Sequence, residues 1–245
     1  VKGCEFLNKM VLYGQKNRWY ALQKRAATNS ISKEVKAYYD SLQIITQGYN
    51  SLLNGKWNPV MTTRQGFAAS YFELPKLMTV SLPDVPSLGV LAEGEDVLQG
   101  KSSIHTLPAF NTYFRQSYYV DLFNKGIIPL NWSVTTSDDW IVIDKKEGIT
   151  KLEERIWVSI DWTKVPVGER ISGVIDVMAG SAGKDKIYVS VFNPSSPSLQ
   201  EMDSLFVEHN GYVSINASDY HRKVENEDIK IELIPNLGFE KASVQ

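Results

Sequence analysis

The sequence has 245 residues, of which 43% are hydrophobic and 22% are charged, as in a soluble globular protein with one large domain or two ordinary ones. Its net charge of −2 argues against a nucleic-acid-binding protein, because proteins that follow phosphates carry a basic excess. Cys4 is the only cysteine, which excludes an internal disulfide, and no apolar run approaches the roughly 20 residues of a membrane span.

The first third of the chain has helical periodicity. Apolar residues recur at three- and four-residue steps between about residues 4 and 29. The stretch Asn29-Ser30-Ile31-Ser32 supplies cap-type residues for a second helix, and Asn54-Gly55 suits the end of that helix. Two long helices with a short connection predict an antiparallel hairpin, which needs a further packing partner because it cannot bury both of its faces alone.

Prolines interrupt the next part of the chain and indicate a connector between the helices and the strand-forming region. Pro75, Pro83 and Pro86 break regular structure, and the apolar residues Leu88–Ala92 predict one strand within the connector.

The stretch from Val120 to Asn193 alternates with a period of two, which is typical of half-buried antiparallel strands. Around Trp157 the aliphatic residues share one face, whereas Trp157 itself takes the other face. The predicted strands, including two further candidates after a loop, are Val120–Phe123, Ile141–Ile143, Ile156–Ile160, Val174–Val177, Ile187–Val191, Tyr212–Ile215 and Ile229–Leu233.

Together these elements predict an α+β protein. An N-terminal antiparallel helical hairpin or partial bundle is followed by an immunoglobulin-like antiparallel β-sandwich. We place the helical portion at residues 1–75, a connector with an edge strand at 76–118, the sandwich at 119–234 and a C-terminal tail at 235–245.

No pattern in the sequence identifies a reactive centre. Cys4 and the three histidines are scattered without ligand spacing, so we expect no metal site and no cofactor. The stretch from Gly180 to Lys184 lacks the spacing of a phosphate-binding loop and is better interpreted as a hairpin turn. Carboxylates that could form a glycosidase pair all lie in turn-like or charged surface positions; they are Glu93, Glu95, Asp96, Asp138, Asp139, Glu153 and Glu154.

Aromatic residues near the predicted turns are more suggestive, because Trp and Tyr rings stack on sugar rings. Trp57, Tyr71, Trp132, Trp140 and Trp162 have such positions, although an aromatic residue in a sandwich is more often part of the core.

Several motifs, in order and spacing, resemble a known family over nearly the whole chain. They are Val1-Lys2-Gly3-Cys4, Gly14-Gln15-Lys16-Asn17-Arg18-Trp19-Tyr20-Ala21, Gly55-Lys56-Trp57-Asn58, Asp121-Leu122-Phe123-Asn124-Lys125-Gly126, Ser159-Ile160-Asp161-Trp162 and Gly211-Tyr212-Val213-Ser214-Ile215. The pattern resembles the helical-bundle and β-sandwich region after the catalytic barrel in glycoside hydrolase family 115, the xylan α-glucuronidases.

The resemblance implies a non-catalytic accessory region of a bacterial enzyme that acts on glucuronic-acid-decorated hemicellulose. Its partners would be the upstream catalytic barrel, a glucuronoxylan-like polysaccharide or oligosaccharide, and, in a homodimer, a second copy; neither nucleic acid nor a membrane span is expected. The barrel carries the catalytic carboxylates in this family, so no catalytic residue is carried over. Whether the chain alone is an enzyme stays open. The location would be periplasmic, extracellular or at the cell surface, although no signal peptide is present.

The carbohydrate-contact candidates are Trp57, Asn58, Tyr71, Trp140 and Trp162. The family continues after Lys-Trp-Asn with histidines, whereas this chain has Pro59-Val60-Met61 and no histidine there, which puts the role of this segment in doubt. The alternative function is a stand-alone glycan-binding or structural module at the surface of a polysaccharide-degrading bacterium.

Overall fold

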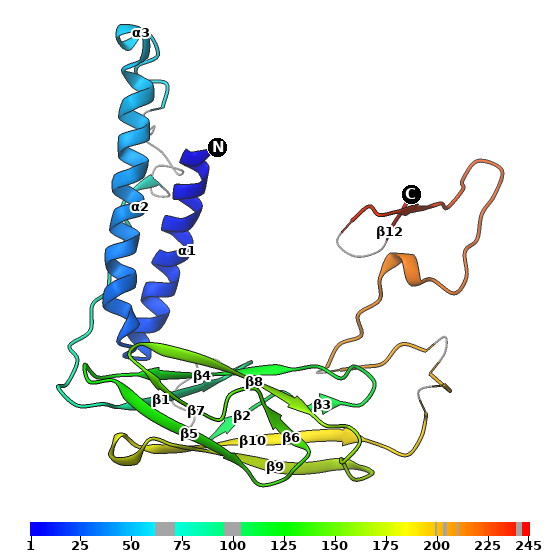
Figure 1. Ribbon diagram of the computed structural model, residues 1–245. Helices are drawn as coiled ribbons and strands as arrows, with labels where there is room; N and C mark the ends of the chain where they lie inside the picture. Colours follow the sequence, from blue (N-terminus) through cyan, green and yellow to red (C-terminus); the bar gives the residue numbers. More distant parts are fainter. Residues whose placement is uncertain (62–71, 96–103, 199, 203–204, 210, 239–241) are drawn as a thin grey trace.

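A computed structural model of the chain describes residues 1–61, 72–95, 104–198, 200–202, 205–209, 211–238 and 242–245. It confirms the predicted fold class, since N-terminal helices are followed by mostly antiparallel sheets (Figure 1). The described residues contain no helix that is both long enough and apolar enough to cross a membrane.

The two long helices, α1 (Lys2–Leu22) and α2 (Ala27–Asn50), lie side by side and stand on the β-sandwich (Figure 1). Met10 and Val35 belong to the small core between them. The short helix α3 (Leu52–Gly55) lies at the far tip.

Helix α2 begins at Ala27, before the cap-type residues that the sequence suggested as its start. Asn29 lies inside the helix because its side chain bonds elsewhere: its amide donates to the carbonyl of Val80 at 3.0 Å and accepts from the Val80 N–H at 2.9 Å. The fully buried Asn17 on α1 does the same with Met78, at 2.9 and 2.7 Å. Two asparagines therefore hold the connector against the helices as a strand partner would.

Two packed sheets form the sandwich (Figure 1). The first has the order β1-β4-β8-β6, and the second has the order β2-β10-β9-β5-β7, with β3 also on β10. Strands β2 and β3 pair with β10 in parallel, whereas all other strand pairs in the two sheets are antiparallel. The bounds are β1 Leu88–Ala92, β2 His105–Thr106, β3 Phe110–Asn111, β4 Tyr118–Asn124, β5 Leu130–Thr136, β6 Ile141–Ile143, β7 Glu147–Thr150, β8 Glu153–Ile160, β9 Gly168–Met178 and β10 Lys184–Asn193.

The core between the sheets contains the inward residues of the period-two pattern. Val120, Ile156, Val158, Ile175 and Ile187 are almost completely inaccessible to solvent. Alternation along β8 therefore places the aliphatic side chains inside and leaves Trp157 on the outer face, as the sequence predicted.

The part of the chain after β10 makes little regular structure. Its elements are the short helix η4 (Ala217–Asp219) and the strands β11 (Leu233–Pro235) and β12 (Ala242–Val244). One further short helix, η3 (Gly180–Ala182), lies between β9 and β10. The predicted strand Tyr212–Ile215 is not formed: Tyr212 makes an isolated bridge to His209. The predicted strand Ile229–Leu233 is replaced by a hairpin in which β11 starts at Leu233. No described residue from 211 onward is buried.

Candidate functional site

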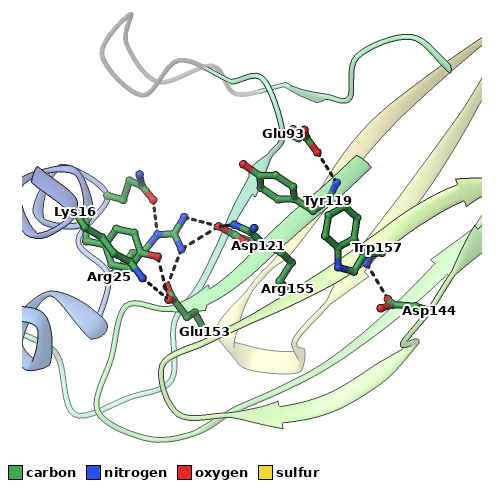
Figure 2. Close-up of polar contacts among 11 residues, drawn as sticks. Lys16, Arg25, Glu93, Tyr119, Asp121, Asp144, Glu153, Arg155 and Trp157 are labelled. Atoms are coloured by element: carbon green, nitrogen blue, oxygen red, sulfur yellow. Dashed lines mark hydrogen bonds and ion pairs between the residues drawn. The ribbon is translucent and has the colours of Figure 1, made fainter. Parts of the chain in front are cut away.

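The helical hairpin meets the four-stranded sheet at Arg25, which lies in the turn between α1 and α2 (Figure 2). Its guanidinium carbon lies 4.3 Å from the centroid of the Tyr20 ring and 4.1 Å from that of the Phe123 ring. Only 1% of Arg25 is exposed. A planar cation between two aromatic faces is a favourable way to bury a guanidinium group.

Two carboxylates from the sheet compensate the buried charge of Arg25. Its Nη1 donates to Glu153 at 2.9 Å, and its Nη2 donates to Asp121 at 3.3 Å (Figure 2). The Tyr20 hydroxyl donates to the other oxygen of Glu153 at 3.0 Å. Burial, together with the nearby charge of Glu153, raises the pKa of Tyr20 far above its ordinary value, so this hydroxyl stays a proton donor.

Gly89 on β1 leaves the space that the Phe123 ring occupies in this junction. A side-chain carbon at that position would lie 2.2 Å from an atom of the Phe123 ring. The absence of a side chain lets Phe123 cover the strand and present its face to Arg25.

Asp121 links the junction to a second arginine on the outer face of the sheet. Arg155 Nε donates to Asp121 Oδ1 at 2.8 Å, and its guanidinium stacks 3.6 Å from the centroid of the Tyr119 ring. The hydrogen bond to Asp121 is the main reason that the pKa of Arg155 is raised. The Arg155 charge is therefore already paired within the protein.

Next to Arg155, Tyr119 and Trp157 lie directly opposite each other on β4 and β8. Their ring centroids are 5.8 Å apart with an interplanar angle of 74°, an edge-to-face contact. Trp157 is 45% exposed. We call Tyr119, Arg155 and Trp157 the aromatic platform.

Two carboxylates flank the platform, and both hold backbone N–H groups. Glu93 accepts from the Tyr119 N–H at 2.9 Å, and Asp144 accepts from the Trp157 N–H at 2.8 Å (Figure 2). Because they lie on opposite sides of the β4–β8 pair, strand spacing and hydrogen-bond length separate them by roughly 10 Å. Glycosidase acid pairs are separated by about 5–9.5 Å, and their carboxyl groups face one bond rather than the backbone. Both carboxylates therefore hold the backbone of the platform strands.

Of the residues predicted from the sequence to contact carbohydrate, Trp57 and Asn58 lie at the far tip of the hairpin. Trp57 is 40% exposed, with Lys56 Nζ 5.3 Å from the ring centroid. Asn58 lines an open pocket of about 580 Å³; the lining residues are Gln47, Asn50, Ser51, Asn54, Gly55 and Asn58.

The other three predicted contacts are not brought together with them. Trp140 is only 3% exposed, because its indole packs in the sandwich core under Gly173, so its ring is closed to a glycan in this structure. Trp162 is half-buried and packs against the same core. Tyr71 lies outside the described residues.

Sequence reasoning missed the aromatic platform as a site. The period-two pattern already placed Trp157 on the outer face of its strand. Its proximity to Tyr119 and Arg155 required the pairing register of β4 with β8, which a single sequence does not contain. Among the described residues, no cluster of three or more His, Cys, Asp or Glu side chains could hold a metal ion.

Comparison with protein families gives a match to the C-terminal part of the chain. Residues 205–245 match the glycosyl hydrolase family 115 C-terminal domain, so the resemblance to the C-terminal region of that family is shown. The match supports a glycosidase-associated accessory region. No curated protein matches the chain.

Three of the solved structures that match this chain each cover less than half of it. A Bacteroides ovatus GH5 xyloglucanase in complex with a XXXG heptasaccharide has 16% identity and a TM-score of 0.32, over 46% of this chain and 20% of that one. A family 123 glycoside hydrolase from Clostridium perfringens has 14% identity and a TM-score of 0.33, over 47% and 29%. The D00-D0 domain of intimin has 7% identity and a TM-score of 0.30, over 46% and 50%. This chain therefore spans half or less of each of these three chains, and similarity at this level carries no argument about function.

Proposed function

We propose that the chain is the non-catalytic accessory part of a xylan α-glucuronidase-like glycosidase that acts on glucuronic-acid-decorated hemicellulose. Its main task is to brace a catalytic barrel that precedes it. The same proposal places the protein in the periplasm or outside a bacterial cell, where such polysaccharides are accessible. The family match at residues 205–245 supports the proposal.

The observation that carries the bracing role is the outward face of α1. Met10, Gly14 and Asn17 face α2 and the connector and are buried. About 100° per residue along a helix puts another apolar set on the opposite side. That set is exposed and consists of Val11, Leu12, Trp19 and Leu22. We call these four residues the α1 outer face.

The polar residues Asn8 and Gln15 interrupt the α1 outer face, so it is a partly apolar surface. Exposed apolar patches of this kind usually mark an interaction site. The Arg25 junction fixes α1 on the sandwich, so a domain seated on the α1 outer face would be held in a fixed position relative to the sheets.

The test uses the complete reading frame and activity on aldouronic acids. Leu12→Glu combined with Leu22→Glu should shorten the half-life of activity at elevated temperature several-fold, because two charges would be buried at the contact with the barrel. The KM should change little, since the proposal assigns α1 to a contact with the barrel and not to a contact with the substrate. Ile149→Glu is the control, because Ile149 is 73% exposed on β7 of the sandwich.

Three results would contradict the proposal. One is a reading frame with no barrel-length sequence before Val1, and another is hydrolysis of aldouronic acids by the present chain alone. The third is equal heat inactivation of the double variant, the control variant and the unaltered enzyme. A second copy on the α1 outer face, which is the homodimer expected from the family, would instead give a concentration-dependent mass that the double variant loses.

A stand-alone glycan-binding module is the second candidate function. The exposed Trp157 beside Tyr119 favours it, because this platform is complete within the present chain and needs no barrel to form.

A further inference from the structure

The aromatic platform is held rigidly in an exposed position. Tyr119 lies near the start of β4 and Trp157 in the middle of β8, and both strands are paired on each side in the four-stranded sheet. Arg155 covers one face of the Tyr119 ring, and Asp144 fixes the backbone of Trp157. Side chains ordered in advance lose little conformational entropy when they bind a ligand.

The position of Trp157 leaves its indole open to a flat ligand. The Tyr119 ring meets it edge to face at 74°, and 45% of the residue is exposed. Two residues further along the same face of β8, Ser159 pairs with Val142 of β6, which is 42% exposed. A shallow surface of this kind fits an extended chain that lies across the strands better than a small molecule that needs a deep pocket.

The charges around the aromatic platform indicate which kind of polymer it can bind. Arg155 pairs with Asp121, through contacts of 2.8 and 3.3 Å, and Asp121 and Glu153 together balance the charges of Arg155 and Arg25. Glu93 and Asp144 add two carboxylates at the flanks, and neither of them forms an ion pair with a cation among the described residues. The rim of the platform is therefore negative, and an anionic polymer would meet like charges on both sides.

We propose that the aromatic platform binds a neutral polysaccharide chain, by stacking a sugar ring on Trp157 while Glu93 and Asp144 exclude acidic glycans. This site is separate from the α1 outer face and does not depend on the bracing role. On a substrate with acidic branches, the platform would select unbranched stretches of the neutral backbone.

The experiment is affinity electrophoresis of the present chain in native gels that contain neutral arabinoxylan, neutral xyloglucan or polygalacturonate. We expect at least one neutral polymer to retard the protein and polygalacturonate not to retard it. Trp157→Ala should weaken the retardation at least about tenfold, the usual result of removing a central aromatic contact. Trp157→Phe, which keeps a ring, should retain an intermediate affinity.

Tyr188→Ala is the matched control, because Tyr188 has a similar exposure of 43% but lies on β10 in the other sheet, away from both the platform and the α1 outer face. It should leave the retardation unchanged, and equal unfolding temperatures of all variants exclude loss of fold. No retardation by either neutral polymer would overturn the proposal. Equal retardation of Trp157→Ala and the unaltered chain, or tighter binding of polygalacturonate, would also overturn it. None of these results depends on whether the α1 variants alter a parent enzyme.

Discussion

Arg25 is the largest side chain that the described part of the protein buries completely. Its charge is matched by Glu153 and Asp121 and covered by Tyr20 and Phe123. A buried ion pair adds little net stability compared with an apolar replacement of both partners, but removal of one partner leaves the other charge without compensation. At the scale of residues, the junction therefore depends on this single side chain.

Arg25→Ala should lower the free energy of unfolding by about 3 kcal/mol or more, because Glu153 and Asp121 would lose their buried partner. Arg155→Ala should cost only about 1 kcal/mol, because the Arg155 side chain is 47% exposed and solvent can replace it. Urea unfolding followed by circular dichroism measures both. Equal losses in the two variants would show that burial does not set the strength of the junction.

His105 on β2 provides a pH-dependent contact between the turn after β1 and β10. Its Nδ1 lies 2.9 Å from Glu95, and its Nε2 lies 3.3 Å from Asp185. The hydrogen bond to Glu95 raises the pKa of His105, whereas burial opposes this change. Because the folded-state pKa is above the unfolded value of 6.5, protonated His105 stabilises the fold below pH 6.5. This contribution is lost as the pH rises through the folded-state pKa.

His105→Gln should therefore destabilise the protein more at pH 6 than at pH 9. A neutral amide keeps the size of the side chain but cannot carry the charge that Glu95 and Asp185 favour. Urea unfolding of both proteins at the two pH values gives the comparison. A loss of stability that is the same at pH 6 and pH 9 would argue against ionisation as its source.

At the scale of elements, strand β1 affects the packing of the helical hairpin indirectly, because it has a glycine where the Phe123 ring of β4 lies. Gly89 makes room for the Phe123 ring, and that ring supports Arg25. Neither residue belongs to a helix, so the packing of the hairpin on the sandwich is determined partly by a glycine in an edge strand.

Gly89→Ala should destabilise the fold by about 1–3 kcal/mol, because the added carbon would displace Phe123. Gly48→Ala is the matched control on α2, where nothing lies within 4 Å of the added carbon. It should stabilise the protein by about 0.5–1 kcal/mol, since alanine is the better helix former. Thermal unfolding measures both changes. A Gly89→Ala variant as stable as the unaltered protein would show that Phe123 can move without loss.

Periodicity was enough to predict two helices and most of the long strands of the sandwich, because burial repeats with the helix or strand period. Strand β5 was not among the predicted strands, although its residues alternate between buried and exposed positions. It could not predict β2 and β3, since two residues are too few for a period, and their parallel pairing with β10 depends on distant segments. The start of α2 differed from the predicted start for a similar reason. Asn29 forms hydrogen bonds with Val80, 51 residues away, and does not cap its own helix.

At the scale of the whole molecule, the hairpin and sandwich hold the buried residues, and the described residues from 211 onward add none. From residue 211 onward every described residue is at least partly exposed. His209, just before this part, contacts the sandwich through Tyr118 and Gln116. Residues 211–245 thus contribute little to the core, although most of the family match lies in them.

Deletion of residues 211–245 should change the unfolding temperature by less than about 2 °C, because changes that remove no buried contact usually alter stability by about 0.5 kcal/mol or less. Differential scanning calorimetry of the trimmed and complete chains tests this. A fall of more than about 5 °C would mean that the C-terminal part packs on the sandwich in solution.

The sequence by itself determined the class of elements, their order, the faces they bury and the resemblance to a family, since each depends on local period or on motifs along the chain. It also predicted Trp57 and Asn58 as neighbours, because they are adjacent in the chain. Only the tertiary structure decided which aromatic rings are exposed to solvent. Trp140 follows a turn but is covered by Gly173, whereas Trp157 is exposed beside Tyr119 because strand pairing placed these two residues opposite each other. Exposure depends on what other segments cover, and one sequence does not encode that locally.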